Sequence, residues 1–104
     1  MDVKRVNQAG EAIRAVVESH TYGWANSEAL REVKRLADEA LLASEHHSDV
    51  SVQVTAIKSW AAMLYSARKH RGYDQGSQTG ADAVRRFIFS HARTLARWGP
   101  QSAE

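Results

Sequence analysis

The chain has 104 residues, of which 43% are hydrophobic and 25% charged, and it contains no cysteine. This length supports a single domain with one modest core, and this composition argues against extensive disorder. The lack of cysteine excludes disulfides, thiolate metal sites and cysteine nucleophiles, and it is typical of a reducing compartment.

The formal net charge of +2 conceals a strong segregation of charge along the chain. Residues 1–57 contain six Lys/Arg and nine Asp/Glu, a net −3, whereas residues 58–104 contain eight and three, a net +5. Such segregation can serve an anionic partner, contacts between copies of the chain, or pairing between helices within the fold.

Apolar side chains recur at helical spacing in the first half of the chain, where they predict helices over residues 3–21 and 27–44. Asn26 or Ser27 is a suitable N-cap for the second helix. The expected core positions are Val6, Ala9, Ile13, Val17 and His20 in the first helix, and Leu30, Val33, Leu36, Ala37, Ala40 and Leu41 in the second.

A third helix is predicted over residues 49–71, with Ser48 or Asp49 as its cap. Its apolar stripe contains Val50, Val54, Ile57, Ala61 and Leu64, and it is widened by Ala56, Trp60, Met63 and Ala67. A helix that is apolar over so much of its circumference is usually central or lies against a second chain.

The segment from Gly72 to Gly80 has glycine at every fourth position, and it is predicted to be a flexible loop or one that becomes ordered on binding. A fourth helix over residues 80–98 follows, with Thr79 and Asp82 as a capping box and Gly99-Pro100 as its stop, before a frayed tail over residues 100–104.

The fourth helix combines an apolar stripe with an arginine stripe. Its expected core face contains Val84, Phe87, Ile88, His91, Leu95 and Trp98. Its outward face contains Arg86, Arg93 and Arg97, with Asp82 and an exposed Phe89 beside them and Arg85 at the flank. Four helices with short connections predict an all-α fold, a single-domain antiparallel up-down four-helix bundle over residues 1–104.

Five histidines raise the question of a metal site. His46 and His47 lie near Asp49, but adjacent side chains diverge and the spacing of a zinc-binding helix is absent, so a solvated loop is expected. His20 and His91 fall in apolar stripes and are expected to make structural hydrogen bonds. No metal and no cofactor is expected.

The segment Arg86-Phe-Ile-Phe-Ser-His91 resembles the arginine-to-histidine signature of HEPN-type ribonucleases, which are small all-helical proteins. The resemblance implies metal-independent RNA cleavage at a dimer interface, with His91 acting on the 2′-hydroxyl or the leaving group and Arg86 stabilising phosphate charge. The chain departs from the signature at Phe87, where that family prefers a polar residue.

The basic C-terminal half predicts a non-enzymatic binding or regulatory protein of adaptor type, with the HEPN-like ribonuclease as the alternative. Arginine contacts to phosphate give affinity without sequence readout, and arginines around an exposed aromatic also suit a protein partner or self-association. The expected contact residues are Arg85, Arg86, Phe89, Arg93 and Arg97 of the fourth helix, and Arg68, Lys69, Arg71 and Tyr73 before it.

A soluble cytoplasmic protein without membrane contact is expected. No apolar run approaches the ~20 residues that cross a bilayer, and the first residues lack the unbroken apolar core of a signal peptide.

Overall fold

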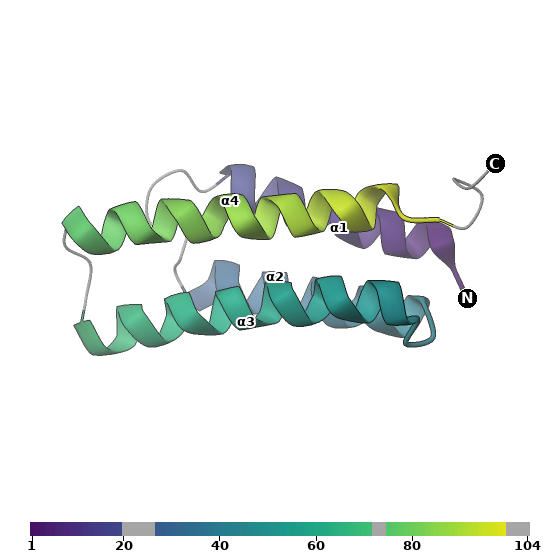
Figure 1. The fold of residues 1–104 in the computed structure, drawn as a ribbon, viewed down its shortest axis with the longest axis horizontal. Coiled ribbons are helices and arrows are strands. Elements are labelled where there is room, and N and C mark those ends of the chain that lie inside the picture. Colours follow the sequence, from purple (N-terminus) through teal and green to yellow (C-terminus); the bar gives the residue numbers. More distant parts are fainter. Residues whose placement is uncertain (20–26, 72–74, 100–104) are drawn as a thin grey trace.

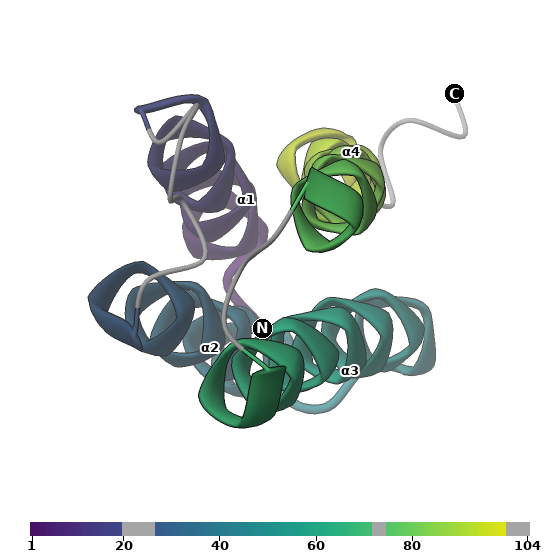
Figure 2. The same ribbon diagram turned by 90° about the vertical axis from the view of Figure 1, so that its left-hand side faces the viewer.

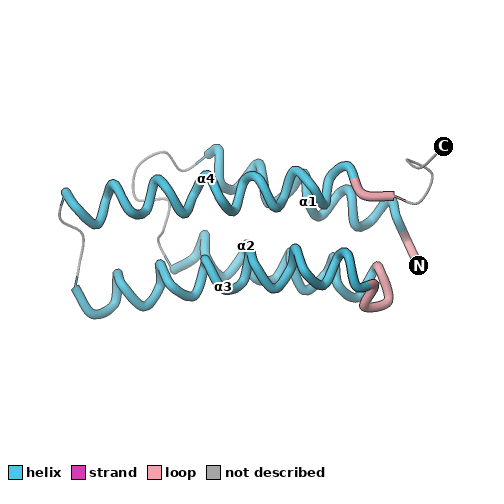
Figure 3. Tube along the Cα trace, viewed as in Figure 1, coloured by secondary structure: helices cyan, strands magenta, loops and turns pink. Residues whose placement is uncertain are grey.

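The computed structural model describes residues 1–19, 27–71 and 75–99; side chains at 19, 27, 64–71 and 75–82 are not described. These ranges form four α-helices, α1 (Val3–Ser19), α2 (Ser27–Ala43), α3 (Ser48–Arg71) and α4 (Gln75–Arg97). Figure 3 shows helices and short loops in the part described, with no strand there. None of these helices combines the length and apolar character of a membrane span.

Each helix packs against two neighbours, and the four together form a bundle. α1 lies against α2 and α4, and α3 lies against the same two helices, as the end-on view in Figure 2 shows. The backbone N–H of Asp2 donates to the carbonyl of Ala43 at 2.7 Å, so the start of α1 meets the end of α2. Figure 1 shows that successive helices run in opposite directions.

The core lies between the four helices and is built from the apolar stripes of all of them. Ile13, Leu30, Ile57, Ile88 and Leu95 are the largest side chains that are fully buried. Valine and alanine fill much of the remaining space, which lets the helices approach closely. The core positions that the helical spacing predicts for α2 are buried apart from Leu41, which is half-buried.

The turn between α2 and α3 is closed by a Schellman motif. The N–H of His46 donates to the carbonyl of Leu41 at 3.0 Å, and the N–H of Glu45 donates to the carbonyl of Leu42 at 3.0 Å. Glu45 and His46 adopt φ of 56° and 60°, a left-handed conformation that usually favours glycine. Ser44 is fully buried and its hydroxyl donates to the carbonyl of Leu41, which fixes the exit of α2.

The two chain-terminal helices are tied together at one end of the bundle. Asp2 caps α1, because its carboxylate accepts a hydrogen bond from the N–H of Arg5 at 3.1 Å. The Asn7 amide of α1 donates to the carbonyls of Leu95 and Trp98 at 2.9 and 2.8 Å. These carbonyls lie at the end of α4, where the regular hydrogen bonds of a helix run out, so Asn7 supplies a cap from the neighbouring helix.

The fourth helix begins earlier than predicted. α4 starts at Gln75, so the expected loop over residues 72–80 and the capping box at Thr79 are wrong for residues 75–80. Glycine costs about 1 kcal/mol in a helix but keeps its N–H, so it weakens a helix without ending it as proline does. As a result α3 and α4 extend beyond α1 and α2 at the end of the bundle where they are joined (Figure 1).

Candidate binding surface

A row of arginines follows the outer face of α4. Arg86, Arg93 and Arg97 are exposed, as predicted, and their spacing of seven and four residues places them on one face of the helix. At 1.5 Å per residue the row is about 16 Å long. We call these three residues the arginine row.

The arginine row has no acidic neighbour on its own helix between residues 83 and 99, where the sequence contains four arginines and neither Asp nor Glu. Within the part of the chain that the structure describes, none of the three arginines forms an ion pair. Asp82 lies one turn before Arg86 on the same helix, but its side chain is not described, so the absence of acidic residues applies to the stretch from Arg86 to Arg97. Along that stretch the positive charge is open to solvent or to a partner.

Four cationic side chains described in the first three helices form ion pairs with acidic side chains close to them. Arg5 pairs with Glu39 at 3.7 Å, Arg14 with Glu11 at 2.9 Å and Lys58 with Asp38 at 2.8 Å. Arg35 pairs with Glu32 and Glu39, and its hydrogen bond lowers the pKa of Glu32. The N-terminal ammonium of Met1 likewise lowers the pKa of Glu45 through a hydrogen bond.

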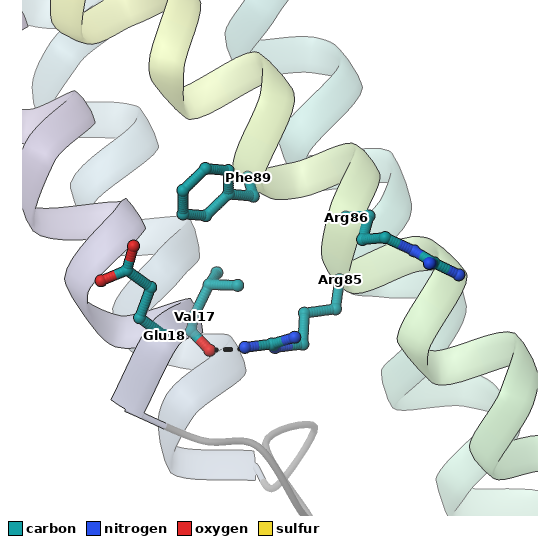
Figure 4. A pocket seen from close by; sticks show the side chains of 5 residues that line it. All are labelled: Val17, Glu18, Arg85, Arg86 and Phe89. Atoms are coloured by element: carbon teal, nitrogen blue, oxygen red, sulfur yellow. Dashed lines mark hydrogen bonds between the residues drawn. The ribbon is translucent and has the colours of Figure 1, made fainter.

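A pocket of about 390 Å³ opens between α1 and α4, lined by Val17, Glu18, Arg85, Arg86 and Phe89. The Nε–H of Arg85 donates to the carbonyl of Val17 at 3.1 Å, near the end of α1. Figure 4 shows the Phe89 ring, the Glu18 carboxylate and the Arg85 guanidinium around one space above Val17. The Arg86 side chain extends away from that space.

Phe89 is not the exposed ring that the sequence predicts. It is half-buried and packs against the core, and the Arg14 guanidinium lies 4.8 Å from its ring centroid, a cation–π contact. The prediction of Phe87 as a core residue is also wrong, because 47% of Phe87 is exposed. Its ring stacks on Trp60 of α3 with centroids 4.9 Å apart.

Phe87 and Phe89 have the reverse of their predicted burial because of the packing of small residues between α1 and α4. Gly10 is buried, and a Cβ built on it would lie 2.5 Å from the backbone nitrogen of Ala96 and 2.7 Å from the carbonyl oxygen of Ala92. This close approach turns the Ala92 side of α4 into the bundle. Phe89 therefore lies in the seam with α1, and Phe87 is moved to the edge facing α3.

The α3–α4 side of the bundle forms what we call the neutral face. Helical register places on it Val52, Gln53, Ala56, Trp60 and Met63 of α3, and Phe87, Ser90, His91 and Thr94 of α4. None of these side chains carries a formal charge when histidine is neutral. Asp49, exposed at the start of α3, shares their register and places a carboxylate at one end of this face. Val52, Met63 and Phe87 are 63%, 55% and 47% exposed, so the face combines neutrality with exposed apolar area.

Arg86 and His91, the pair suggested by the ribonuclease resemblance, are not brought together within the chain. Arg86 is exposed on the outer face of α4, at the edge of the pocket. The Nδ1 of His91 is hydrogen-bonded at 2.7 Å to the Oε1 of Gln53 on α3, as a structural histidine would be. The two side chains therefore point to different sides of one helix.

The histidines of the α2–α3 turn differ from each other. His46 is exposed, whereas His47 is half-buried with its ring 5.0 Å from that of Trp98, edge to face. The Nδ1 of His47 accepts a hydrogen bond from the N–H of Asp49 at 3.1 Å, so this ring caps the start of α3. Among the described residues no group of three or more His, Asp and Glu is placed to hold a metal ion.

Several residues predicted from the sequence lie outside the described part of the chain. Arg68, Lys69 and Arg71 belong to α3, but their side chains are not described, and Tyr73 and His20 lie outside the described residues. Sequence reasoning also missed Arg14, Val17 and Glu18 as neighbours of the α4 surface. Each has an unremarkable place on α1, and only the packing of α1 against α4 brings them there.

Comparison of the chain with models of known protein families, with curated proteins and with solved structures finds no match.

Proposed function

We propose that the protein is a non-enzymatic nucleic-acid-binding module that holds a phosphate backbone along the arginine row of α4. The observation that carries this proposal is the exposure of Arg86, Arg93 and Arg97 on a part of α4 that contains no acidic residue after Asp82. Guanidinium groups form strong, often bidentate hydrogen bonds with phosphate, and a rigid helix presents them in a fixed line.

The packing of Phe89 favours nucleic acid over an acidic protein as the partner of this row. A protein hot spot is usually an aromatic anchor that a partner can bury completely, surrounded by contacts that exclude water. Phe89, an aromatic side chain beside the row, is already packed against the core and carries Arg14 on its ring. What the row offers is charge, which suits phosphate contacts that need no sequence readout.

The test is the salt dependence of binding to a fluorescently labelled single-stranded oligonucleotide, measured by anisotropy. Each phosphate that a protein neutralises on a single strand contributes roughly 0.7 to the slope of log affinity against log salt concentration. A variant with Arg86→Gln, Arg93→Gln and Arg97→Gln is therefore expected to bind much more weakly and to have a slope smaller by roughly 2.

A matched control removes the same charge from α2 through Arg31→Gln, Lys34→Gln and Arg35→Gln, all at exposed positions. This control is expected to retain most of the affinity and slope. Equal losses in the two variants would show a general effect of net charge and contradict a binding role specific to α4. Unchanged binding by the α4 variant would overturn the proposal.

The same protein preparations test the ribonuclease alternative. Incubation with mixed RNA in the presence of a chelator is expected to leave the RNA intact with the wild-type protein and with His91→Ala. Cleavage by the wild type that disappears in His91→Ala would establish the ribonuclease and overturn the non-enzymatic assignment.

The neutral face supports a second candidate partner, namely another copy of the chain. A copy would meet the middle of this face with the same uncharged side chains, so the Trp60–Phe87 stack and Met63 could be covered while Asp49 stays at the end of the contact. Light scattering after size exclusion is expected to give twice the mass of one chain at high concentration. The Met63→Glu variant is expected to give the mass of a single chain under the same conditions. A monomer at all concentrations would contradict self-association.

A further inference from the structure

The pocket between α1 and α4 presents three kinds of chemistry to one space. Glu18 supplies a hydrogen-bond acceptor, Arg85 supplies donors, and Phe89 supplies an aromatic surface above the apolar floor of Val17 (Figure 4). Its volume of about 390 Å³ lies in the lower part of the range of known small-ligand sites.

We propose that this pocket receives one unpaired base of a single-stranded nucleic acid, with guanine as the preferred base. This inference rests on the proposed function, since the arginine row would hold the backbone of the same strand. Arg86 follows Arg85 in the chain and lines the pocket, and it is also the first residue of the arginine row. The pocket therefore lies at the Arg86 end of the row.

Arg85 is held in position before any ligand arrives. It is half-buried, and its Nε–H is fixed by the carbonyl of Val17 at 3.1 Å. A guanidinium has five N–H donors, and among the described residues only the Nε–H of Arg85 is engaged, which leaves the four on its terminal nitrogens to face a ligand. A long side chain anchored in this way loses less conformational freedom on binding than a free one.

Guanine complements the two polar groups of the pocket. Its O6 and N7 are adjacent acceptors that suit a guanidinium, whereas its amino group is a donor that a carboxylate can accept. Glu18 and Arg85 approach the pocket from different helices, so they can engage different edges of one ring. Phe89 is packed against the core and Arg14 lies over its ring, but the part of the side chain that lines the pocket adds an apolar contact for any planar base.

The experiment measures anisotropy with an eight-nucleotide oligothymidine that carries one central guanine, and with matched strands that carry adenine, cytosine or an abasic site there. Base contacts of this kind are expected to strengthen binding of the guanine strand roughly tenfold over the abasic strand. Glu18→Gln keeps the size of the side chain and is expected to remove the preference for guanine while leaving the abasic strand bound as before.

Glu28→Gln removes one carboxylate from the exposed surface of α2 and serves as the matched control, with the guanine preference expected to stay. A second variant, Phe89→Leu, is expected to weaken all strands with a central base and to spare the abasic strand. Circular dichroism confirms that each variant is folded.

The outcomes separate this inference from the proposed function. If all strands bind equally, with or without the central base, and still depend on the arginine row, the pocket takes no base and this inference is overturned. If no strand binds, or binding ignores the arginine row, the proposed function fails instead. Loss of the guanine preference in Glu28→Gln as well as in Glu18→Gln would also contradict a base in the pocket.

Discussion

The two seams that α4 forms with its neighbours differ in both closeness and charge. Against α1 the backbones nearly touch at Gly10, and further along the seam opens into a pocket lined by Glu18, Arg85 and Phe89 among others. Against α3 the contact is made by neutral groups, the Trp60–Phe87 stack and the hydrogen bond between His91 and Gln53.

This difference shows that two sides of one helix can offer different surface chemistry. The seam with α1 leads to the arginine row, where charge is available for a ligand. The seam with α3 exposes apolar area at Val52, Met63 and Phe87, with Asp49 as a charged group at its end, which suits contact with another largely neutral surface. A single apolar stripe read around α4 does not reveal this division, because both seams contain phenylalanine.

The largest predicted effect tests the closeness of the seam with α1. At an exposed helix position, replacing glycine with alanine stabilises by up to about 1 kcal/mol. Gly10→Ala is expected to reverse that sign and destabilise by about 3 kcal/mol, because the new Cβ meets backbone atoms that cannot move separately. Urea denaturation measures the change, and a stabilised Gly10→Ala would show that the helices are further apart.

A smaller loss is predicted at the end of the same seam. Asn7→Leu removes both hydrogen bonds to the carbonyls of Leu95 and Trp98, and it is expected to cost about 2 kcal/mol because both bonds are partly buried and leucine offers no donor in their place. Gln8→Leu, at an exposed position of the same helix, is the control. Similar losses in both variants would argue against a capping role for Asn7.

The smallest predicted effect concerns the seam with α3. In a double-mutant cycle with Trp60→Leu and Phe87→Leu, the stacked rings are expected to show a coupling energy of about 1 kcal/mol in the free energy of unfolding. The cycle of Phe87→Leu with Leu42→Ala, on a helix that does not pack beside α4, is expected to be additive. Additivity in both cycles would mean that the rings contribute only their separate burial.

Helical periodicity was sufficient to predict the four helices and most of the core. Val6, Ile13, Val33, Ile57 and Ile88 recur at the spacing that a buried helix face needs, and all are fully buried. The exposure of the arginine row followed from the same periodicity. These features are local, because they depend on the order of residues within one helix.

The pocket and the exchange of Phe87 for Phe89 depend on packing between helices. Periodicity gives a face but not its exact centre, and in α4 that centre is set by the contact of Gly10 with Ala92 and Ala96. The start of α4 at Gln75 was also missed, since glycines there weaken the helix without ending it. The sequence by itself thus determined which residues of α4 are available to a partner. Only the tertiary structure decided that Arg14 contacts Phe89, and that Val17 and Glu18 share a pocket with Arg85 and Phe89, because these contacts depend on how α1 packs against α4.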